Sequence, residues 1–210
     1  MALVKYNDRS LRNLTTAPAA VTGNSPGALV HIKTLTASSS GTLSFVDGAS
    51  SVVLDNTYPI YKFEFINIHP ATDDTNLQVG FRDGSTDYDA IKTTTFFRAY
   101  HEENGSAASL AYNASLDLAQ STAFQPISFE SGNDADLGIS GTLELFNPSS
   151  TTFVKHFLVK SNICTASSQT VNSFIAGYCN TTTAIDAVQF KMSSGNMDSG
   201  KIKLYGIKDS

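Results

Sequence analysis

The sequence predicts an all-β protein: an antiparallel, jelly-roll-like β-sandwich preceded by an extended N-terminal arm. Only 16% of its 210 residues are charged, whereas about a quarter is usual in globular proteins. Ser, Thr, Asn and Gly replace the charged residues, and this composition favours strands and turns over helices. Strand-like runs recur along the chain at the spacing of about 8–12 residues that is typical of a sandwich or barrel.

Strands are predicted from residue 28 onward, where apolar and polar residues begin to alternate with a period of two. The predicted strands are 28–36, 41–48, 58–69, 76–84, 90–100, 124–131, 136–148, 151–161, 170–180, 185–192 and 200–207. This number of short strands is enough for two packed antiparallel sheets.

The run 58–69 is the strongest of these strands. Its aromatic residues Tyr61, Phe63 and Phe65 share one face, and charged residues occupy the other. The alternation changes phase directly after Phe65, which predicts a β-bulge or bend at that point.

The final run predicts how the fold closes. Ile202 and Leu204 are expected to point inward, with Lys201 and Lys203 outward. A terminal strand must pair with structure that already exists. We therefore expect it to lie beside an early strand of a double-sheet antiparallel fold, of which the jelly roll is a common form.

Two segments do not alternate. Residues 1–27 are rich in small residues, Pro and Gly, and are predicted to form an arm that docks onto another body, leaving 28–210 as the β domain. Residues 101–123 are predicted to hold a short helix, or to be a long loop with one strand near Leu110–Leu118.

No catalytic motif occurs in the sequence. The four histidines, His31, His69, His101 and His156, are not at metal-ligand spacing. A G-x-S-x-G nucleophile elbow and a phosphate-binding loop are both missing. We therefore predict a protein that is not an enzyme, with no catalytic, cofactor-binding or metal-binding residue.

Acidic residues are candidates for metal ligands and for catalytic pairs. Those in predicted turns match no EF-hand loop and are interpreted as solvated. They are Asp73, Asp74, Asp83, Asp87, Asp89, Asp134 and Asp136. Two carboxylates in a groove would suggest a glycoside hydrolase, but Glu64 and Glu144 alternate with apolar neighbours as outward-facing residues do.

Net charge and cysteine content indicate which partners and which cellular compartment to expect. The net charge of -5 and the scattered Lys and Arg residues argue against a nucleic-acid partner. No run is long enough to span a membrane, and the N-terminus has no apolar signal region, so synthesis in a cytoplasm is expected. Cys164 and Cys179 are then expected to be free thiols, with a disulfide between them left open.

Exposed aromatic residues offer one further kind of site. Tyr88, Tyr100, Tyr112 and Tyr178 lie in predicted loops or at strand ends, where they could stack on sugars. Because tryptophan is absent from the chain, packing in the core or at its rim is the favoured interpretation.

Several long stretches carry a resemblance to a known family. They are MALVKYNDRSLRNLT, SFVDGASSVVLDNTYPIYKFEFINIHPATD, SGTLELFNPSSTTFVKHF and AGYCNTTTAIDAVQFKMSSGNMDSGKIKLYGIKDS. Together they resemble small structural proteins of marine tailed bacteriophages, of the cyanophage and pelagiphage kind. The closing strand matches a G-x-I-x-L-Y-G pattern, here Gly200, Ile202, Leu204, Tyr205 and Gly206.

The resemblance implies a virion component displayed on the particle surface and anchored through its N-terminal arm. Its partners would be other virion proteins of the capsid, portal or tail, and further copies of itself, with a homotrimer expected. A head decoration or head fibre and a tail fibre remain open. The alternative is a carbohydrate- or receptor-binding adhesin module of the tail, with a host surface glycan as its ligand.

Overall fold

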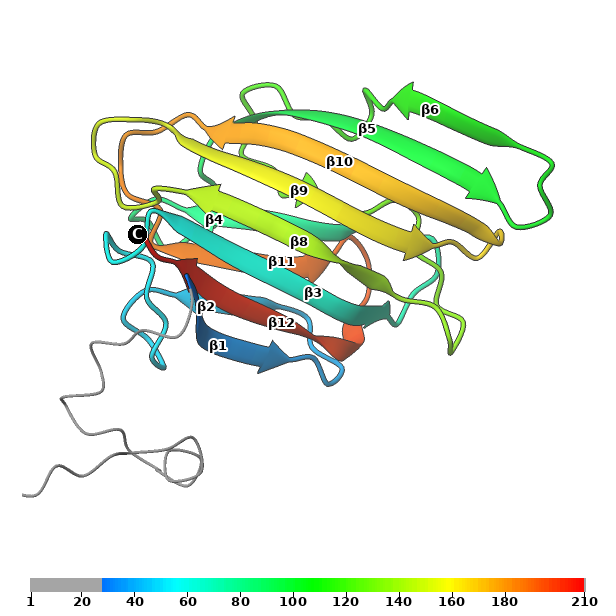
Figure 1. Cartoon of the computed structure of the whole chain (residues 1–210), viewed down its shortest axis with the longest axis horizontal. Coiled ribbons are helices and arrows are strands. Elements are labelled where there is room, and N and C mark those ends of the chain that lie inside the picture. Colours follow the sequence, from blue (N-terminus) through cyan, green and yellow to red (C-terminus); the bar gives the residue numbers. More distant parts are fainter. Residues whose placement is uncertain (1–27, 210) are drawn as a thin grey trace, which may run out of the picture.

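The computed structural model describes residues 28–209, which form an antiparallel β-sandwich. An eight-stranded sheet packs face to face against a four-stranded sheet (Figure 1). The described part of the chain contains no helix, and so none that could cross a membrane. The predicted all-β sandwich is therefore confirmed.

The strands follow the alternation of the sequence. Their bounds are β1 Leu29–Thr36, β2 Leu43–Val46, β3 Ile60–Pro70, β4 Leu77–Arg82, β5 Lys92–Glu102, β6 Ala108–Tyr112, β7 Gln125–Pro126, β8 Ile139–Phe146, β9 Lys155–Cys164, β10 Gln169–Cys179, β11 Ala187–Met192 and β12 Met197–Ile207. Most lie within a few residues of the predicted runs.

Strand order places the end of the chain beside its beginning. The large sheet runs β1-β12-β3-β8-β9-β10-β5-β6, and the small sheet runs β2-β11-β4-β7. The closing strand β12 thus pairs with β1 on one side and β3 on the other. This confirms that the last strand completes a sheet next to early strands, with Ile202 and Leu204 buried.

The chain alternates between the sheets in its early and late parts. Strands β1, β3, β8 and β12 belong to the large sheet, and β2, β4, β7 and β11 belong to the small one. These eight strands are compatible with the jelly-roll-like arrangement that we predicted. Strands β5, β6, β9 and β10 extend the large sheet beyond them (Figure 1).

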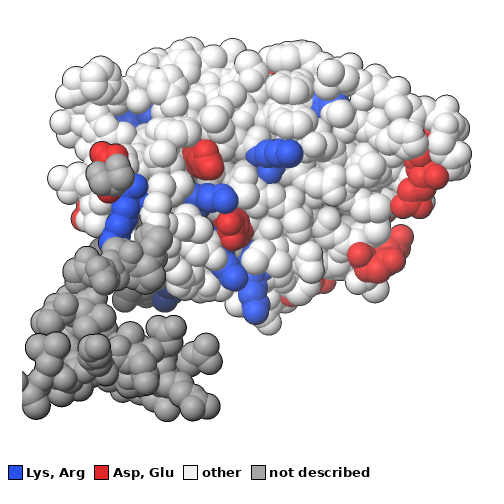
Figure 2. Space-filling view, viewed as in Figure 1, with Lys and Arg blue, Asp and Glu red and all other residues white. Residues whose placement is uncertain are grey.

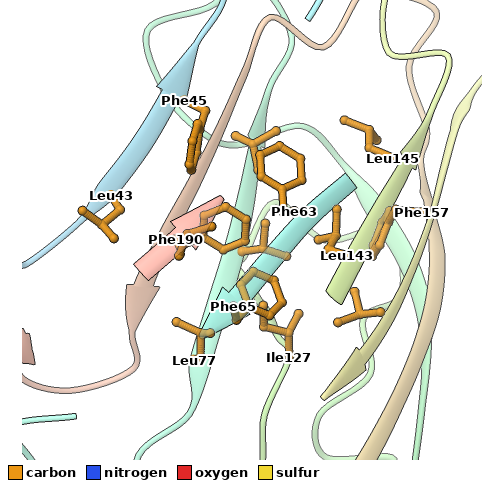
Figure 3. Close-up of a cluster of buried hydrophobic side chains, with 14 of the residues drawn as sticks. Leu43, Phe45, Phe63, Phe65, Leu77, Ile127, Leu143, Leu145, Phe157 and Phe190 are labelled. Atoms are coloured by element: carbon orange, nitrogen blue, oxygen red, sulfur yellow. The ribbon is translucent and has the colours of Figure 1, made fainter. Parts of the chain in front are cut away.

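Aromatic side chains from both sheets fill the core between them (Figure 3). Phe190 of β11 meets Phe45 of β2 and both Phe63 and Phe65 of β3, with ring centroids 5.3–6.3 Å apart. All four side chains are buried because alternation directs every second residue of these strands inward. This cluster fixes which face of the large sheet is left outside.

The predicted change of phase in the strongest strand is present as a β-bulge. Pairing of β3 with β8 shifts register between Phe65 and Ile68, and Asn67 has a positive φ of 48°. The Asn67 backbone N–H donates to the Ser140 hydroxyl instead of to a strand carbonyl.

One predicted strand was wrong. Residues 124–131 form only the two-residue strand β7, with an isolated bridge from Ser131 to Thr75. Pro126 has no N–H to give to a ladder. The Leu77 N–H donates to the Ser128 hydroxyl oxygen at 2.7 Å, so a side chain takes the place of a backbone carbonyl.

The segment 101–123 contains a strand and no helix. The strand is β6, at Ala108–Tyr112, which is earlier than the predicted Leu110–Leu118. It forms a hairpin with β5 and lies at the far edge of the large sheet (Figure 1). The predicted arm, residues 1–27, lies outside the described residues.

Candidate functional site

The outer face of the eight-stranded sheet is divided into a charged and an apolar part. Figure 2 shows Lys, Arg, Asp and Glu gathered over β12, β3 and β8, and few charges over the middle of β10, β5 and β6, with acidic side chains at the right-hand end of the sheet. We call the residues Lys62, Glu64, Glu144 and Lys203 the charged stripe. We call the residues Phe97, Leu110, Tyr112, Leu158 and Phe174 the apolar face.

The charged stripe is built by cross-strand pairing. Lys62 and Glu64 are two residues apart on β3 and form an ion pair at 3.2 Å. Glu144 of β8 lies opposite Lys62, and Lys203 of β12 lies opposite Glu64. Opposite charges therefore alternate across three strands. Such exposed pairs contribute little to stability, about 0–1 kcal/mol each.

The apolar face is built by the register of β6, β5 and β10. Phe97 of β5 lies opposite Tyr112 of β6 and opposite Phe174 of β10. The Phe97 and Phe174 rings stack with centroids 5.0 Å apart and an interplanar angle of 10°. Leu158 adds a further apolar side chain from β9.

Four of these five side chains are exposed. Leu110 is 70% exposed, Tyr112 55%, Leu158 49% and Phe97 41%. Isolated exposed apolar residues are common, but large contiguous apolar patches are rare on monomers and mark interaction sites.

A shallow depression crosses the boundary between the two parts. Its volume is about 340 Å³, and the apolar side chains Phe97, Leu158 and Phe174 line it. Glu144 and Lys160 also line it, opposite Leu158 and Phe174, and the Lys160 ammonium group is 5.7 Å from the centre of the Phe174 ring. An open surface with an apolar centre and charges at its rim is typical of protein interfaces.

A second unusual group lies inside the sandwich. Cys179 of β10 has Lys92 of β5 opposite it on one side and Lys155 of β9 on the other, and all three side chains are buried. The Lys92 ammonium donates to the Ala90 carbonyl at 2.6 Å.

Burial changes the proton affinity of all three groups. It lowers the pKa of Lys92 and of Lys155, because an ammonium ion is poorly solvated there. It raises the pKa of the Cys179 thiol to about 12. Since a thiol rather than a thiolate is present at neutral pH, Cys179 is a poor nucleophile and metal ligand.

The four histidines lie on four different strands, β1, β3, β5 and β9, and three of them have structural contacts. His31 lies edge-on to Tyr205, with ring centroids 5.4 Å apart. His69 bonds the Asp134 carbonyl through Nε2 at 3.1 Å, and His156 lies beside Tyr178. Within residues 28–209, no group of three or more His, Cys, Asp or Glu side chains could hold a metal ion.

Residues of the acidic turns form hydrogen bonds with other groups close by. In the turn after β4, the Ser85 hydroxyl donates to the Asp87 carbonyl and to the Asp89 carboxylate. The Asp73 carboxylate accepts from the Asn133 N–H at 3.1 Å. Glu64 and Glu144 point outward as predicted, on the open surface of the sheet.

The candidate tyrosines divide between packing and exposure. Tyr100 packs against the core and Tyr88 lies near Phe124. Tyr112 is exposed on the apolar face, where its hydroxyl donates to the Asp117 carboxylate. Both cysteines are free thiols, as expected.

Most of the apolar face was missed by sequence reasoning, which singled out only Tyr112. A signal was present in adjacent apolar residues within predicted strands. Phe96 and Phe97 are neighbours in β5, so they must point to opposite faces, and Phe96 is the buried one. Leu158 likewise interrupts the polar face of β9.

Comparisons with known proteins assign no family. No family model matches the chain, and no curated protein matches it. One solved structure, a structural-genomics protein of unknown function from Bacteroides ovatus, is similar at 6% identity and a TM-score of 0.27. The similarity covers 49% of this chain and 45% of that one, and it is too low to support an argument about function.

Proposed function

We propose that the protein is a non-enzymatic virion structural component, displayed on the surface of a bacteriophage particle and docked through its N-terminal 27 residues. The observation that carries an assembly role is the apolar face, with four large apolar residues between 41% and 70% exposed. An exposed apolar surface of this kind is stabilised when a protein partner covers it.

The physical argument starts from the separation of charged and apolar residues on one sheet. Burial of apolar surface favours association by about 25 cal/mol per Å², and this contribution does not depend on the orientation of the groups. The neighbouring charged stripe stays solvated and limits which surfaces fit beside it. A rigid sheet with these two parts is suited to repeated, symmetric contacts between proteins.

The kind of assembly is proposed from the sequence resemblance to marine tailed-phage structural proteins. Capsid, portal or tail proteins would be the partners, as part of a head decoration, a head fibre or a tail fibre, with no nucleic-acid contact. Self-association is part of the proposal, and the homotrimer remains a prediction of the resemblance.

A tail adhesin is the second candidate function. The exposed ring of Tyr112, together with its hydroxyl contact to Asp117, is the feature that favours it, since sugars stack on aromatic rings and bond to carboxylates. The aliphatic residues Leu110 and Leu158 favour a protein partner instead, because they offer a sugar no specific contact.

The test is detection of the chain on purified particles. Virions are isolated by density gradient from the host that carries the gene, and an antibody raised against residues 28–209 is applied to intact particles. Binding to intact particles is expected, as is its loss when residues 1–27 are deleted. A chain that stays in the soluble fraction, absent from all particles, contradicts the proposal.

A further inference from the structure

The two sheets have four edges, and three of these edges are protected against pairing with another strand. β1 has a register shift between His31 and Lys33, and it carries the Lys33 charge. β2 has only four residues, and β7 has two residues, one of which is Pro126. Bulges, charges, proline and short length are the common means of blocking an edge.

The fourth edge, β6, has none of these devices. Its five residues, Ala108–Tyr112, are all exposed and contain no charged residue and no proline. Its pairing with β5 has no register shift. An exposed, uncharged and regular edge strand is a template for a further strand.

Backbone bonds at the two ends of the β5–β6 pair fix which residues bond to β5. The Glu102 N–H donates to the Ala107 carbonyl at 2.9 Å, and the Asn113 N–H donates to the Phe96 carbonyl at 2.8 Å. Because bonded and non-bonded pairs alternate in antiparallel sheets, the odd-numbered residues of β6 bond to β5.

The even-numbered residues of β6 therefore direct their N–H and C=O groups away from the sheet. These residues are Ala108, Leu110 and Tyr112. Their side chains lie on the apolar face, since Tyr112 is opposite Phe97 and Leu110 is opposite Ala99. The same three residues thus present both free backbone groups and apolar side chains.

We propose that β6 pairs with β6 of a second copy of this chain, antiparallel about a two-fold axis at Leu110. Leu110 then faces Leu110 of the second copy as a bonded pair, and Ala108 faces Tyr112. All three outward N–H groups and all three outward carbonyls find partners. The two large sheets join into one continuous sheet.

The sequence of β6 is self-complementary about Leu110, because small Ala108 faces large Tyr112 and no charge lies at the axis. At the two-fold axis Leu110 faces Leu110 of the second copy, so a charged side chain at this position would face a like charge. Residues 104–116 contain no Asp, Glu, Lys or Arg. The nearest acidic residues, Glu102, Glu103 and Asp117, precede or follow the strand in sequence, and the Asp117 carboxylate accepts from the Tyr112 hydroxyl at one end of it.

The two-fold axis also joins the two apolar faces. It stands perpendicular to the sheet, so both copies present the same face on the same side. Phe97, Leu110 and Tyr112 of one copy then continue into the same residues of the other. The β6–β6 contact depends on the proposed function in one respect, which is that the apolar face is an assembly surface.

Five residues make a small contact. Stable protein interfaces bury about 1,200–2,000 Å², so a reversible dimer that depends on concentration is expected from β6 alone. The high local concentration of copies held on a particle would favour the same contact.

Disulfide trapping tests the register directly. A bonded antiparallel pair has Cα atoms about 5.5 Å apart, within the range of about 4.4–6.8 Å that a disulfide spans. In the full chain carrying Cys164→Ser, Leu110→Cys is expected to give a covalent dimer under mild oxidation. The neighbouring change Ser109→Cys is the matched control and is expected to remain monomeric.

Charge substitution separates edge pairing from stacking of the apolar faces. Leu110→Lys places two ammonium groups against each other at the axis and is expected to abolish the dimer in sedimentation velocity. Leu158→Lys alters the same face three strands away and is expected to keep it. Both sites are exposed, so both variants are expected to melt at the temperature of the unaltered chain.

Three results would overturn the proposal. They are equal trapping at positions 109 and 110, a dimer that survives Leu110→Lys, and a dimer that is lost with Leu158→Lys alone. None of these results changes whether the chain is found on particles, so failure of the two-fold contact and failure of the proposed function can be told apart.

Discussion

Replacement of Phe190 by alanine tests the packing that leaves the apolar face outside. Phe190 is fully buried and is the residue of the small sheet that contacts both Phe63 and Phe65 of the large sheet. Its ring also meets Phe45, at a centroid distance of 6.3 Å (Figure 3). The substitution therefore removes the centre of the contact between the sheets.

The expected loss follows from burial and from the aromatic pairs. Replacing a buried phenylalanine with alanine lowers the free energy of unfolding by about 3–5 kcal/mol. Three edge-to-face partners place Phe190 at the upper end, since each such pair adds about 0.5–1.5 kcal/mol. We expect the free energy of unfolding to fall by about 5 kcal/mol, and Tm to fall by about 10–20 °C.

The assay is urea unfolding followed by circular dichroism, with Phe153→Ala as the matched control. Phe153 is 69% exposed, so its loss is expected to change stability by less than about 0.5 kcal/mol. A loss below about 2 kcal/mol for Phe190→Ala, or an equal loss for both variants, would refute the placement of Phe190 at the centre of the core.

Three further predictions concern the thiols and a glycine at a register shift within β12. Cys164 is expected to react with iodoacetamide in the folded protein while buried Cys179 reacts only after unfolding, so a mass spectrum showing equal labelling would contradict the fold at β10. Because burial raises the pKa of Cys179 from 9.0 to about 12, the folded state keeps a proton that the unfolded state loses. Its contribution to stability is complete below pH 9.0 and is lost as pH rises toward about 12. Urea unfolding at a series of pH values should therefore show the free energy of unfolding of the unaltered chain falling relative to that of Cys179→Ala. The expected fall is up to about 1.4 kcal/mol per pH unit. Gly200 has a φ of 111°, and an added Cβ would lie 2.4 Å from the Asn67 carbonyl oxygen, so Gly200→Ala is expected to lower stability by more than about 1 kcal/mol in the same assay.

Local alternation was sufficient to predict most strands. In β3 and β12 the apolar residues recur at every second position, and the core requires one face of each, so sequence and structure agree. The bulge after Phe65 was also visible, because it shifts the pattern within one strand.

Features that depend on side-chain bonds or on pairing between distant strands could not be predicted. The segment after Phe124 looked like a strand, yet hydroxyl groups such as that of Ser128 replace its backbone ladder. The apolar face depends on β6, β5 and β10 lying side by side, although Tyr112 and Phe174 are far apart in the sequence. No pattern within one strand indicates that register.

The sequence pattern also did not predict that two lysines are buried. Lys92 and Lys155 begin β5 and β9, where a charged residue normally marks the solvent side of a strand. They point inward because Phe96 and Phe157, on the same faces, must enter the core. The cost of burying each ammonium group is offset in part by its bond to a carbonyl, at Ala90 and Thr181.

The mass of the unaltered full chain in solution, measured by light scattering over a range of concentrations, tests the central claim most directly. If the chain associates through β6, its mass is expected to rise from 22.4 kDa toward twice that value as concentration increases. A mass of three chains would support the homotrimer and contradict the two-fold contact. A mass that stays at 22.4 kDa at every concentration would contradict self-association altogether.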